Sequence, residues 1–332
     1  MTKINIAIVG ATGMVGRTFL KVLEERNFPI NNLYLFSSKK SAGSEVEFRG
    51  EKYIVEELNE NSFDKDIQIA LFSAGGSVST KYAPIAASKG VIVVDNSSAW
   101  RMNENVPLVV PEVNPEAIKE HKGIIANPNC STIQAMVPLK PLHDKYKIKR
   151  IVYSTYQAVS GSGVKGTKDL ENGIKGLPNS FYPHPIAYNC LPHIDVFMDN
   201  GYTKEEMKMI NETMKILNDY NLKITATTVR VPVTNGHSES INLEFENEVD
   251  VNDVKELLAN SEGVVLIDNP SNNEYPTAFE TSGRDEVFVG RIRKDFSVDN
   301  GINMWVVADN IRKGAATNAV QIAEYIVKNN LV

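Results

Sequence analysis

The sequence predicts an α/β protein in which a doubly wound parallel sheet is followed by a second, α+β domain. Short apolar runs alternate with helical patterns through the first third of the chain, and this alternation is typical of parallel sheets built from β-α-β units. Further along, the strand-like segments are longer and alternate apolar with polar residues, which indicates a largely antiparallel sheet with one packed face. With 332 residues, the chain is long enough for two separate cores.

The elements of the first domain follow from the spacing of its apolar residues. In the first expected helix these residues recur three or four positions apart, as on one face of a helix. The later strands are short and almost wholly apolar, as buried parallel strands are. The expected strands are Ile4–Val9, Leu33–Phe36, Ile67–Phe72 and Val91–Val94, and the expected helices are Met14–Arg26 and Val78–Lys89.

The pattern changes around Asn127, where the second domain begins. A helix is expected over Ser131–Tyr146, with Pro138 and Pro141 kinking it or ending it early. The later strands are Arg150–Ala158, Lys223–Val233, Ser238–Glu246, Val287–Arg293 and Ile302–Ala308, with helices over Thr203–Asp219 and Val251–Asn260. The last amphipathic helix, Ala315–Val327, is expected to return to the first domain. The chain therefore divides into residues 1–128 plus 315–332 and residues 129–314.

Charge and composition exclude several kinds of protein. The net charge of −6 argues against a nucleic-acid partner, because phosphate backbones are bound by basic surfaces. No run of 18 apolar residues predicts a membrane span, and a strand directly after Met1 leaves no room for a signal peptide. Two cysteines are too few for a disulfide framework, and no His/Cys cluster has metal-ligand spacing. We expect a cytoplasmic protein without a metal.

The first strand runs directly into a glycine-rich turn, Gly10-Ala-Thr-Gly13-Met-Val-Gly16. Glycine lets the backbone turn tightly and approach a pyrophosphate, and the following helix offers its free N–H groups to phosphate. The spacing GxxGxxG is less specific than GxGxxG, and the glycines could be simple turn formers. With a strand before the turn and a helix after it, a Rossmann-type dinucleotide site is the better interpretation.

Two further segments suit the same cofactor. The second strand ends in Ser37-Ser38-Lys39-Lys40, where an NAD enzyme usually carries an acidic residue for the ribose. Hydroxyl and ammonium groups favour the 2′-phosphate of NADP, although two surface lysines can equally be solvated charge. Ser73-Ala74-Gly75-Gly76 is a second glycine-rich strand end, expected under the pyrophosphate or nicotinamide.

A candidate nucleophile lies in Asn127-Pro128-Asn129-Cys130-Ser131-Thr132. A cysteine at a helix N-terminus can have its pKa lowered from about 8.5 to roughly 3.5–7.5. Isolated cysteines are commonly buried structural residues, but the polar neighbours of Cys130 favour a nucleophile. Cys190 has no such setting and is interpreted as a small packing residue.

A thiolate beside a nicotinamide has a specific chemistry. It adds to an aldehyde, the adduct loses hydride to the cofactor, and the resulting thioester is released by phosphate as an acyl phosphate. A second group must move a proton on and off oxygen. His237 is the best candidate, because it follows the turn at Asn235-Gly236 that can direct it inward. The other histidines lack comparable contexts.

Taken together, these residues resemble the aspartate-β-semialdehyde dehydrogenase family over nearly the whole chain. The matching motifs are the turn Gly10–Gly16, Val94-Asp-Asn-Ser-Ser98 with Arg101, Val109-Val-Pro-Glu-Val-Asn114, Pro128-Asn-Cys-Ser-Thr132, Gln157-Ala-Val-Ser-Gly161, Glu212-Thr-Met-Lys215, Arg230 with His237-Ser-Glu239, and Gly314–Glu324. The family fold is a Rossmann domain, here 1–128 plus 315–332, and an α+β catalytic and dimerisation domain, here 129–314.

The resemblance implies a role for each matched residue. Cys130 would be the nucleophile, His237 the acid/base, and Gln157 would orient the covalent intermediate. The substrate-binding residues would be Arg230 for the α-carboxylate, Glu212 for the amino group, and Arg101, Asn129 and Lys215 for phosphate. Read without the resemblance, Glu212 and Lys215 would be an ordinary surface pair three residues apart. The NADP contacts would be Gly10, Thr12, Gly13, Met14, Val15, Gly16, Ser37, Ser38, Lys39, Ser73, Ala74, Gly75, Ser160, Gly161 and Asn310.

The same resemblance implies a homodimer or homotetramer that reduces L-β-aspartyl phosphate with NADPH, on the route to lysine, methionine, threonine and isoleucine. Two alternatives remain. The related N-acetyl-γ-glutamyl-phosphate reductases place an aromatic residue and a proline after their cysteine, whereas Ser131 and Thr132 follow here. A catalytically silent dinucleotide-binding paralogue should have lost Cys130 or His237, and both are present. Glyceraldehyde-phosphate oxidation would need a different nucleophile segment.

Overall fold

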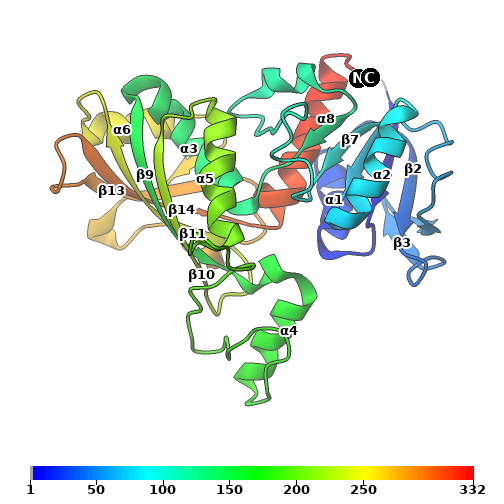
Figure 1. The fold of residues 1–332 in the computed structure, drawn as a ribbon, viewed down its shortest axis with the longest axis horizontal. Coiled ribbons are helices and arrows are strands. Elements are labelled where there is room, and N and C mark those ends of the chain that lie inside the picture. Colours follow the sequence, from blue (N-terminus) through cyan, green and yellow to red (C-terminus); the bar gives the residue numbers. More distant parts are fainter. Residues whose placement is uncertain (1–2) are drawn as a thin grey trace. The chain divides into compact units, whose positions relative to one another are not determined.

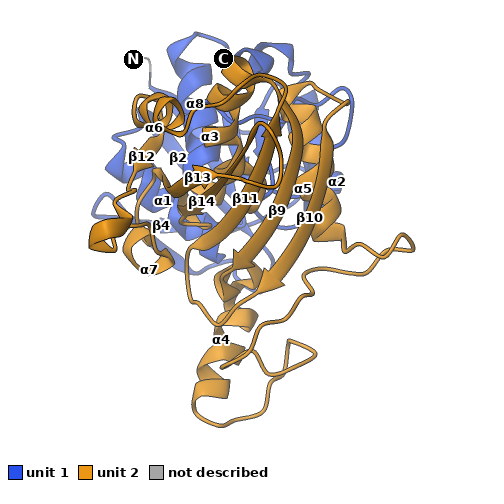
Figure 2. Cartoon of the chain, turned by 90° about the vertical axis from the view of Figure 1, so that its left-hand side faces the viewer, with its two compact units in different colours: residues 1–129, 315–332 blue, residues 130–314 orange. Residues whose placement is uncertain are grey.

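The computed structural model describes residues 3–332 and contains two compact units (Figure 1). Unit 1 comprises the chain up to Asn129 together with Ala315–Val332, and unit 2 comprises Cys130–Gly314 (Figure 2). The division expected from the sequence lies one residue earlier. Each unit has its own sheet and its own helices.

Unit 1 is built on a six-stranded parallel sheet in the order β5-β2-β1-β6-β7-β8. Its strands are β1 (Ile4–Val9), β2 (Ile30–Ser37), β5 (Glu56–Glu57), β6 (Ile69–Phe72), β7 (Ile92–Asp95) and β8 (Ile124–Ala126). The order reverses at β1, so the carboxyl ends of β1 and β6 meet at the point where dinucleotides bind in such folds. The predicted parallel sheet is confirmed. The hairpin β3 (Glu45–Phe48) and β4 (Glu51–Ile54) and the short strands β5 and β8 were not predicted.

Three long helices accompany this sheet: α1 (Met14–Glu25), α2 (Gly76–Ser88) and α8 (Asn318–Lys328). Every residue of β1 is buried, because a sheet strand with covered faces has no wet side. Residues of α1 and α8 join β1 in one apolar core, which includes Phe19, Leu23, Val320 and Ile326. The last helix begins later than predicted, since a π-helical turn over Arg312–Thr317 precedes it.

Unit 2 carries a mixed six-stranded sheet in the order β10-β9-β11-β14-β13-β12. Its strands are β9 (Ile148–Gln157), β10 (Lys223–Arg230), β11 (His237–Phe245), β12 (Val264–Leu266), β13 (Val287–Lys294) and β14 (Gly301–Ala308). The three central pairs are antiparallel, as predicted, and the two edge pairs, β10–β9 and β12–β13, are parallel.

One face of this sheet is covered by helices. Helices α3 (Cys130–Tyr146), α5 (Lys204–Leu217) and α6 (Val251–Ala259) contact its strands. Along β11 the residues His237, Glu239 and Ile241 are fully buried, whereas Ser240 on the opposite face is partly exposed. The predicted contrast between a packed face and a wetter face is therefore confirmed.

Pro138 and Pro141 were expected to kink α3 or to end it early, and the second of these alternatives is wrong, because the helix runs through both prolines to Tyr146. Each proline removes one backbone hydrogen bond. However, every residue from Ser131 to Leu139 is buried, and this packing outweighs the local loss.

A projecting arm of unit 2 was not predicted. It contains α4 (Gly163–Ile174), which extends beyond the end of β9 and β10 (Figures 1 and 2). Asp169 organises the loop after α4, since its carboxylate accepts hydrogen bonds from the N–H groups of Ser180, Phe181 and Tyr182 at 2.8–2.9 Å.

Candidate active site

The glycine turn after β1 is as tight as its sequence predicts. Gly10 has φ +91°, and a Cβ there would lie 2.4 Å from the carbonyl oxygen of Ser73. A Cβ on Gly16 would lie 2.2 Å from the carbonyl oxygen of Gly10. Only glycine fits either position, so the turn packs against both the loop after β6 and the first turn of α1.

This turn presents a helix end that suits an anion. Gly13 is the N-cap of α1 and gives no side-chain hydrogen bond, and the first turn, beginning with Met14 and Val15, has no acidic residue. Gly75 caps α2 in the same way. Uncapped N–H groups at a helix N-terminus are available to phosphate.

The end of β2 lies beside the same turn. Ser37 Oγ is 2.9 Å from Thr12 Oγ1, which joins the second strand to the glycine turn. Ser38 and Lys39 follow and are exposed. Ser73, Ala74 and Gly75 follow β6, and Ser73 is in contact with Gly10 as described above. The predicted nucleotide residues of unit 1 are thus brought together around the ends of β1, β2 and β6.

Cys130 is the first residue of α3, as predicted, and its side chain is partly buried. A Cβ on Gly314 would lie 2.9 Å from the Cβ of Cys130, so the segment before α8 packs directly on this residue. One helical turn later, Gln134 Nε2 donates to the carbonyl oxygen of His237 at 3.2 Å. This bond brings the first turns of α3 beside the start of β11.

Three predicted residues form a row across the end of the unit 2 sheet. Arg230 on β10 pairs with Gln157 on β9, and His237 on β11 lies next to the register pair Ser238 and Tyr156. All three are on the covered face and at most 4% exposed. A Cβ on Gly161 would lie 3.0 Å from Arg230 Nη1 and 3.3 Å from His237 Nε2.

The surroundings of His237 fix its protonation. Its Nδ1 accepts a hydrogen bond from the Ala158 N–H at 3.0 Å, so the neutral ring carries its proton on Nε2. No described residue hydrogen-bonds to Nε2. Complete burial, and then the charge of Arg230, hold the pKa of His237 well below its ordinary value. The ring therefore presents a neutral N–H donor at neutral pH.

The guanidinium of Arg230 is held by a hydrogen bond at Nη1, while its Nε makes none with the described residues. Its Nη1 donates to the carbonyl oxygen of Ala158 at 2.6 Å, and its backbone exchanges two hydrogen bonds with Leu191. Its Nε is buried without a hydrogen bond from any described residue. A guanidinium with an unused donor edge suits a carboxylate ligand.

Most of the other predicted residues are buried within their own units. On α5, Glu212 is 1% exposed, which rules out an ordinary surface pair with Lys215. In unit 1, Arg101 donates from Nε to the Asn127 carbonyl at 2.9 Å and from Nη2 to the Asn96 carbonyl at 2.8 Å. Asn129 is 6% exposed. In unit 2, Asn310 Nδ2 is 3.0 Å from Ser160 Oγ, beside Gly161.

The expectation that Cys190 packs inside is wrong, because its side chain is exposed. Its neighbour Leu191 pairs with Arg230 and is 4% exposed. Successive residues of an extended segment point in opposite directions, so burying Leu191 leaves Cys190 on the surface.

Sequence reasoning missed three charged residues of unit 2, two of them buried (Glu205 and Glu239) and one partly buried (Lys208). Glu239 is completely buried two residues after His237, and neither of its carboxylate oxygens is hydrogen-bonded by a described residue. Burial raises its pKa well above the ordinary value. The other two, Glu205 and Lys208, lie on α5. Glu205 is three residues before Lys208 and seven before Glu212, so the three side chains share one helix face. The even spacing of Glu239 from His237 was the signal that could have found it.

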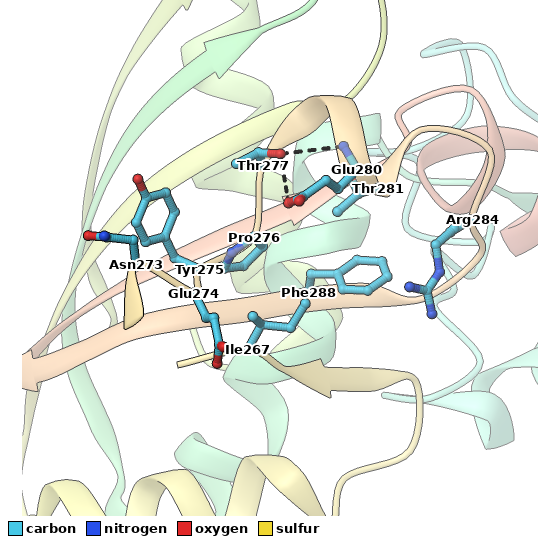
Figure 3. A pocket seen from close by; sticks show the side chains of 10 residues that line it. All are labelled: Ile267, Asn273, Glu274, Tyr275, Pro276, Thr277, Glu280, Thr281, Arg284 and Phe288. Atoms are coloured by element: carbon cyan, nitrogen blue, oxygen red, sulfur yellow. Dashed lines mark hydrogen bonds between the residues drawn. The ribbon is translucent and has the colours of Figure 1, made fainter. Parts of the chain in front are cut away.

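Two hollows in unit 2 contain no predicted catalytic residue. One, of about 480 Å³, is lined by residues from Ile267 to Phe288, including Glu280 and Arg284 (Figure 3). The other, of about 540 Å³, lies on the wetter sheet face over Tyr156, Ser240 and Trp305. Within residues 3–332 no cluster of three or more His, Cys, Asp or Glu residues could hold a metal ion. No helix in that range is long and apolar enough to cross a membrane.

Both units match models of known families. The model described as "Semialdehyde dehydrogenase, NAD binding domain" matches residues 5–121, and "Semialdehyde dehydrogenase, dimerisation domain" matches residues 139–313. The chain is 61% identical to the aspartate-semialdehyde dehydrogenase of Aquifex aeolicus, with 99% of each protein covered.

Solved structures give the same result. Aspartate semialdehyde dehydrogenase II of Vibrio cholerae, complexed with ASA, aligns at a TM-score of 0.94 and 48% identity, covering 99% of both chains. The Candida albicans enzyme with NADP aligns at a TM-score of 0.79 and 26% identity, covering 100% of both chains. These likenesses extend over both units.

Proposed function

The chain belongs to the aspartate-semialdehyde dehydrogenase family, and we propose that it reduces L-β-aspartyl phosphate to L-aspartate-β-semialdehyde with NADPH, reversibly. The observation that carries the proposal is Cys130 at the start of α3, tied through Gln134 to His237. The activity serves the biosynthesis of lysine, methionine, threonine and isoleucine.

The residues of unit 1 fit a nicotinamide dinucleotide. The tight turn at Gly10 and Gly16 leaves no side chain between the backbone and a pyrophosphate, and the uncapped start of α1 supplies N–H donors. At the end of β2, Ser37, Ser38 and Lys39 offer donors and no carboxylate, which favours the 2′-phosphate of NADP over a bare ribose. The Candida albicans relative solved with NADP is consistent with this choice.

Covalent catalysis begins at Cys130. The sulfur attacks the acyl carbon of the aspartyl phosphate and forms an S–C bond. The bond between this carbon and the oxygen that bridges it to phosphorus then breaks, and its electron pair leaves with the phosphate. The N-terminal end of α3 stabilises the thiolate that this attack requires. The result is a thioester on Cys130.

When bound, the nicotinamide cofactor supplies the hydride that reduces this thioester. The role of His237 is then to donate a hydrogen bond from its Nε2–H to the oxygen on which negative charge develops. Because its Nδ1 is held by the Ala158 N–H, the ring needs no rotation to present that donor. Expulsion of the Cys130 sulfur releases the aldehyde and restores the thiolate.

Substrate recognition rests on charge pairs. The open donor edge of Arg230 binds the α-carboxylate, and the buried Glu212 faces the α-ammonium. The acetylated amine of an N-acetyl-γ-glutamyl-phosphate substrate is uncharged, so it could not form an ion pair with a buried carboxylate. Arg101, Asn129 and Lys215 bind the phosphate that leaves or attacks. Ser160, Gly161 and Asn310 complete the cofactor contacts from unit 2.

We also propose that the protein works as a homodimer in the cytoplasm. The family model over residues 139–313 is described as a dimerisation domain, and higher assembly to a homotetramer is compatible with it. A cytoplasmic, reducing location accords with two cysteines of which neither forms a disulfide.

The decisive experiment is a phosphate-dependent assay of NADPH formation from aspartate semialdehyde. Cys130→Ala should abolish turnover and leave NADP binding intact, whereas the matched control Cys190→Ala should keep near wild-type turnover. Turnover by Cys130→Ala at a near wild-type rate would refute the mechanism. Failure of the wild-type enzyme to use aspartate semialdehyde would refute the proposed substrate.

A further inference from the structure

A 3₁₀ turn, η2 (Val159–Ser162), joins β9 to the arm that contains α4. The turn carries Ser160 and Gly161, which are two of the proposed cofactor contacts. Gly161 also lies against the row, since a Cβ there would be 3.0 Å from Arg230 Nη1 and 3.3 Å from His237 Nε2. A displacement of η2 would therefore change the surface that unit 2 offers to the cofactor.

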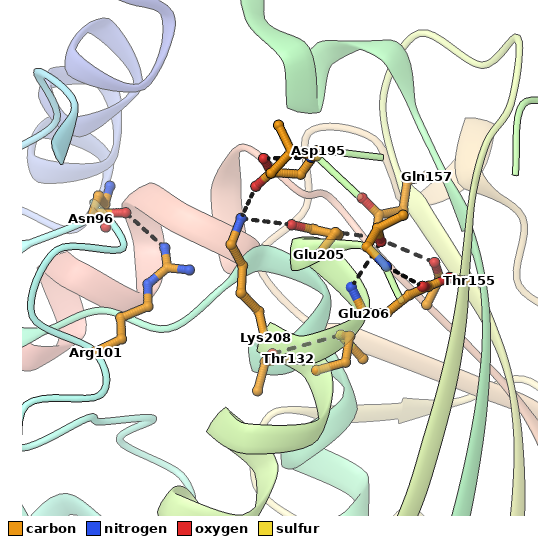
Figure 4. A network of polar contacts seen from close by, with 12 residues as sticks. Asn96, Arg101, Thr132, Thr155, Gln157, Asp195, Glu205, Glu206 and Lys208 are labelled. Atoms are coloured by element: carbon orange, nitrogen blue, oxygen red, sulfur yellow. Dashed lines mark hydrogen bonds and ion pairs between the residues drawn. The ribbon is translucent and has the colours of Figure 1, made fainter. Parts of the chain in front are cut away.

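The first half of η2 is held by the segments around the row. The N–H groups of its first two residues donate to the carbonyl oxygens of Val233 and Thr234, at 2.8 and 3.2 Å. The strand before it ends at Gln157, whose Nε2 donates to Thr155 Oγ1 at 3.3 Å (Figure 4). These bonds all lie before Ser162, the last residue of the turn.

The far end of η2 is held by the arm. Ser162 is the N-cap residue of α4, and a serine in this position normally accepts a hydrogen bond from an N–H group of its own helix. Here its side chain makes no such bond. Its Oγ instead accepts a hydrogen bond from the hydroxyl of Tyr182 at 3.0 Å. The serine therefore joins the turn to the loop after α4 and does not cap the helix.

Tyr182 is itself firmly placed. Its backbone N–H donates to the carboxylate of Asp169 at 2.9 Å. Its ring is 8% exposed and lies in an apolar cluster with Val159, Leu170, Ile186 and Leu191. Burial raises the pKa of Tyr182 above its ordinary value, and the hydrogen bond to Ser162 offsets this only in part. The hydroxyl therefore keeps its proton at neutral pH and remains a donor.

Gly166 allows α4 to approach this hydrogen bond closely. A Cβ at Gly166 would lie 2.6 Å from Tyr182 Oη and 2.7 Å from Ser162 Cβ. The helix, the tyrosine and the turn therefore meet at one point, where no side chain separates them.

We propose that Tyr182 is a positioning residue that fixes the far end of η2 through Ser162 and so places Ser160 and Gly161 for the nicotinamide cofactor. The inference rests on the proposed function, because it needs the cofactor to bind at these two residues. Tyr182 acts through the turn and not on the reacting atoms. The arm is then a support of the cofactor site.

Loss of the Tyr182 hydroxyl should weaken cofactor binding. Tyr182→Phe keeps the ring in its cluster and removes the bond to Ser162. The Kd for NADPH should rise by about threefold to tenfold, the effect of one net hydrogen bond, in a fluorescence titration that needs no turnover. The KM for aspartate semialdehyde should change less than about twofold, because Arg230 is held by Ala158 and Leu191. An unchanged Kd for NADPH would overturn the inference.

A second variant tests whether the effect passes through Ser162. Ser162→Ala removes the acceptor of the same bond, so it should raise the Kd for NADPH by a similar factor. Adding Tyr182→Phe to this variant should raise the Kd no further. If the two increases multiply, Tyr182 does not act through Ser162 and the inference fails. If Tyr182→Phe does not fold, Ser162→Ala decides alone, and an unchanged Kd in it refutes the inference.

Tyr202→Phe is the matched control. The hydroxyl of Tyr202 lies 3.0 Å from Thr225 Oγ1, near the start of β10, whereas Arg230 ends that strand. The substitution therefore removes a bond of the same kind and length in unit 2. It should lower the melting temperature about as much as Tyr182→Phe and leave the Kd for NADPH unchanged. An equal rise of the Kd in this control would mean that loss of any such bond weakens cofactor binding, and would count against a positioning role.

Measurements on the wild-type protein separate the two proposals. Its binding of NADPH and its turnover of aspartate semialdehyde are measured in parallel. A wild type that fails in either measurement refutes the proposed function. An active wild type whose Kd for NADPH does not change in Tyr182→Phe refutes only the role of Tyr182.

Discussion

At the scale of single residues, His237 and Glu239 make the unit 2 site depend on pH in opposite ways. They lie two residues apart on the covered face of β11 and are both completely buried. Burial favours the neutral form of each: it lowers the pKa of the imidazole and raises that of the carboxyl. A neutral Glu239 also adds no negative charge that would draw a proton onto His237. The two groups therefore support one protonation state of the site.

The sign of each contribution to stability follows from these shifts. The unfolded His237 gains a proton below about pH 6.5 while the folded ring stays neutral, so this group lowers stability as the pH falls from there. The unfolded Glu239 loses its proton above about pH 4.3 while the folded carboxyl keeps it, so this group lowers stability as the pH rises from there.

Glu239→Gln should therefore stabilise the protein increasingly as the pH rises above about 4.3. The amide has the shape of the neutral acid and cannot ionise. The gain should reach about 1.4 kcal/mol for each unit by which the folded pKa exceeds the unfolded one. Urea unfolding at a series of pH values measures it, with the exposed Glu248→Gln as control. A gain that does not grow with pH would contradict a protonated Glu239.

At the scale of elements, the sequence predicts those helices and strands that neighbouring residues determine better than those that depend on tertiary packing. β1 and α1 could be predicted almost to the residue, because glycines separate a uniformly apolar strand from a helix with periodic apolar positions. The arm helix α4 could not, because Gly166 and Gly173 weaken its pattern and its burial depends on Tyr182 and Ala187. The two prolines in α3 suggested an early end of the helix for a related reason: burial of the helix outweighs the low helix preference of proline.

The residues of the candidate site also differ in whether their sequence neighbours were enough to predict them. Cys130, His237 and the glycine turn could be proposed from their neighbours in sequence. The row that aligns Arg230, Gln157 and His237 could not, because it depends on the register of three strands that are far apart in the chain. Glu205 was missed because a charged residue in the first turn of a helix normally reads as a dipole partner or a solvated group.

Gly16→Ala should disrupt the nucleotide site as a unit. The added methyl group would meet the Gly10 carbonyl oxygen at 2.2 Å, so α1 must move away from the turn or the turn must open. NADP affinity should fall by at least tenfold, and stability should fall by about 1–3 kcal/mol, as overpacking does. Fluorescence titration with NADPH and thermal unfolding measure the two effects.

Gly76→Ala is the matched control for this change. It also lies at the start of a helix in unit 1, but its Cβ would meet nothing within 4 Å. It should leave stability unchanged or slightly higher, since alanine favours helix over glycine. Equal effects of the two substitutions would mean that close packing at Gly16 is not what the turn requires.

At the scale of the whole molecule, we expect the proposed dimer to form through the wetter face of the unit 2 sheet. Tyr156 packs against Trp305 there with ring centroids 5.5 Å apart and planes tilted by 46°, and it remains 39% exposed. Aromatic residues of this kind are enriched at protein interfaces. The hollow of about 540 Å³ on this face adds Arg291 and Arg293 to its apolar lining. Because β11 carries His237 on one face and Ser240 on the other, association would brace the catalytic strand from behind.

Ser240→Arg should convert the dimer to a monomer. Ser240 lies on β11 between Ser154 of β9 and Trp305 of β14, and its side chain is partly exposed. A single chain can extend an arginine from this face into water, whereas two copies packed face to face would bury two unpaired charges. Sedimentation or light scattering should give the mass of one chain for Ser240→Arg and of two chains for the exposed control Asn247→Arg. If Ser240→Arg is folded and still has the mass of two chains at the same concentration, the copies associate through another surface, and the open face of the sheet then needs a different explanation.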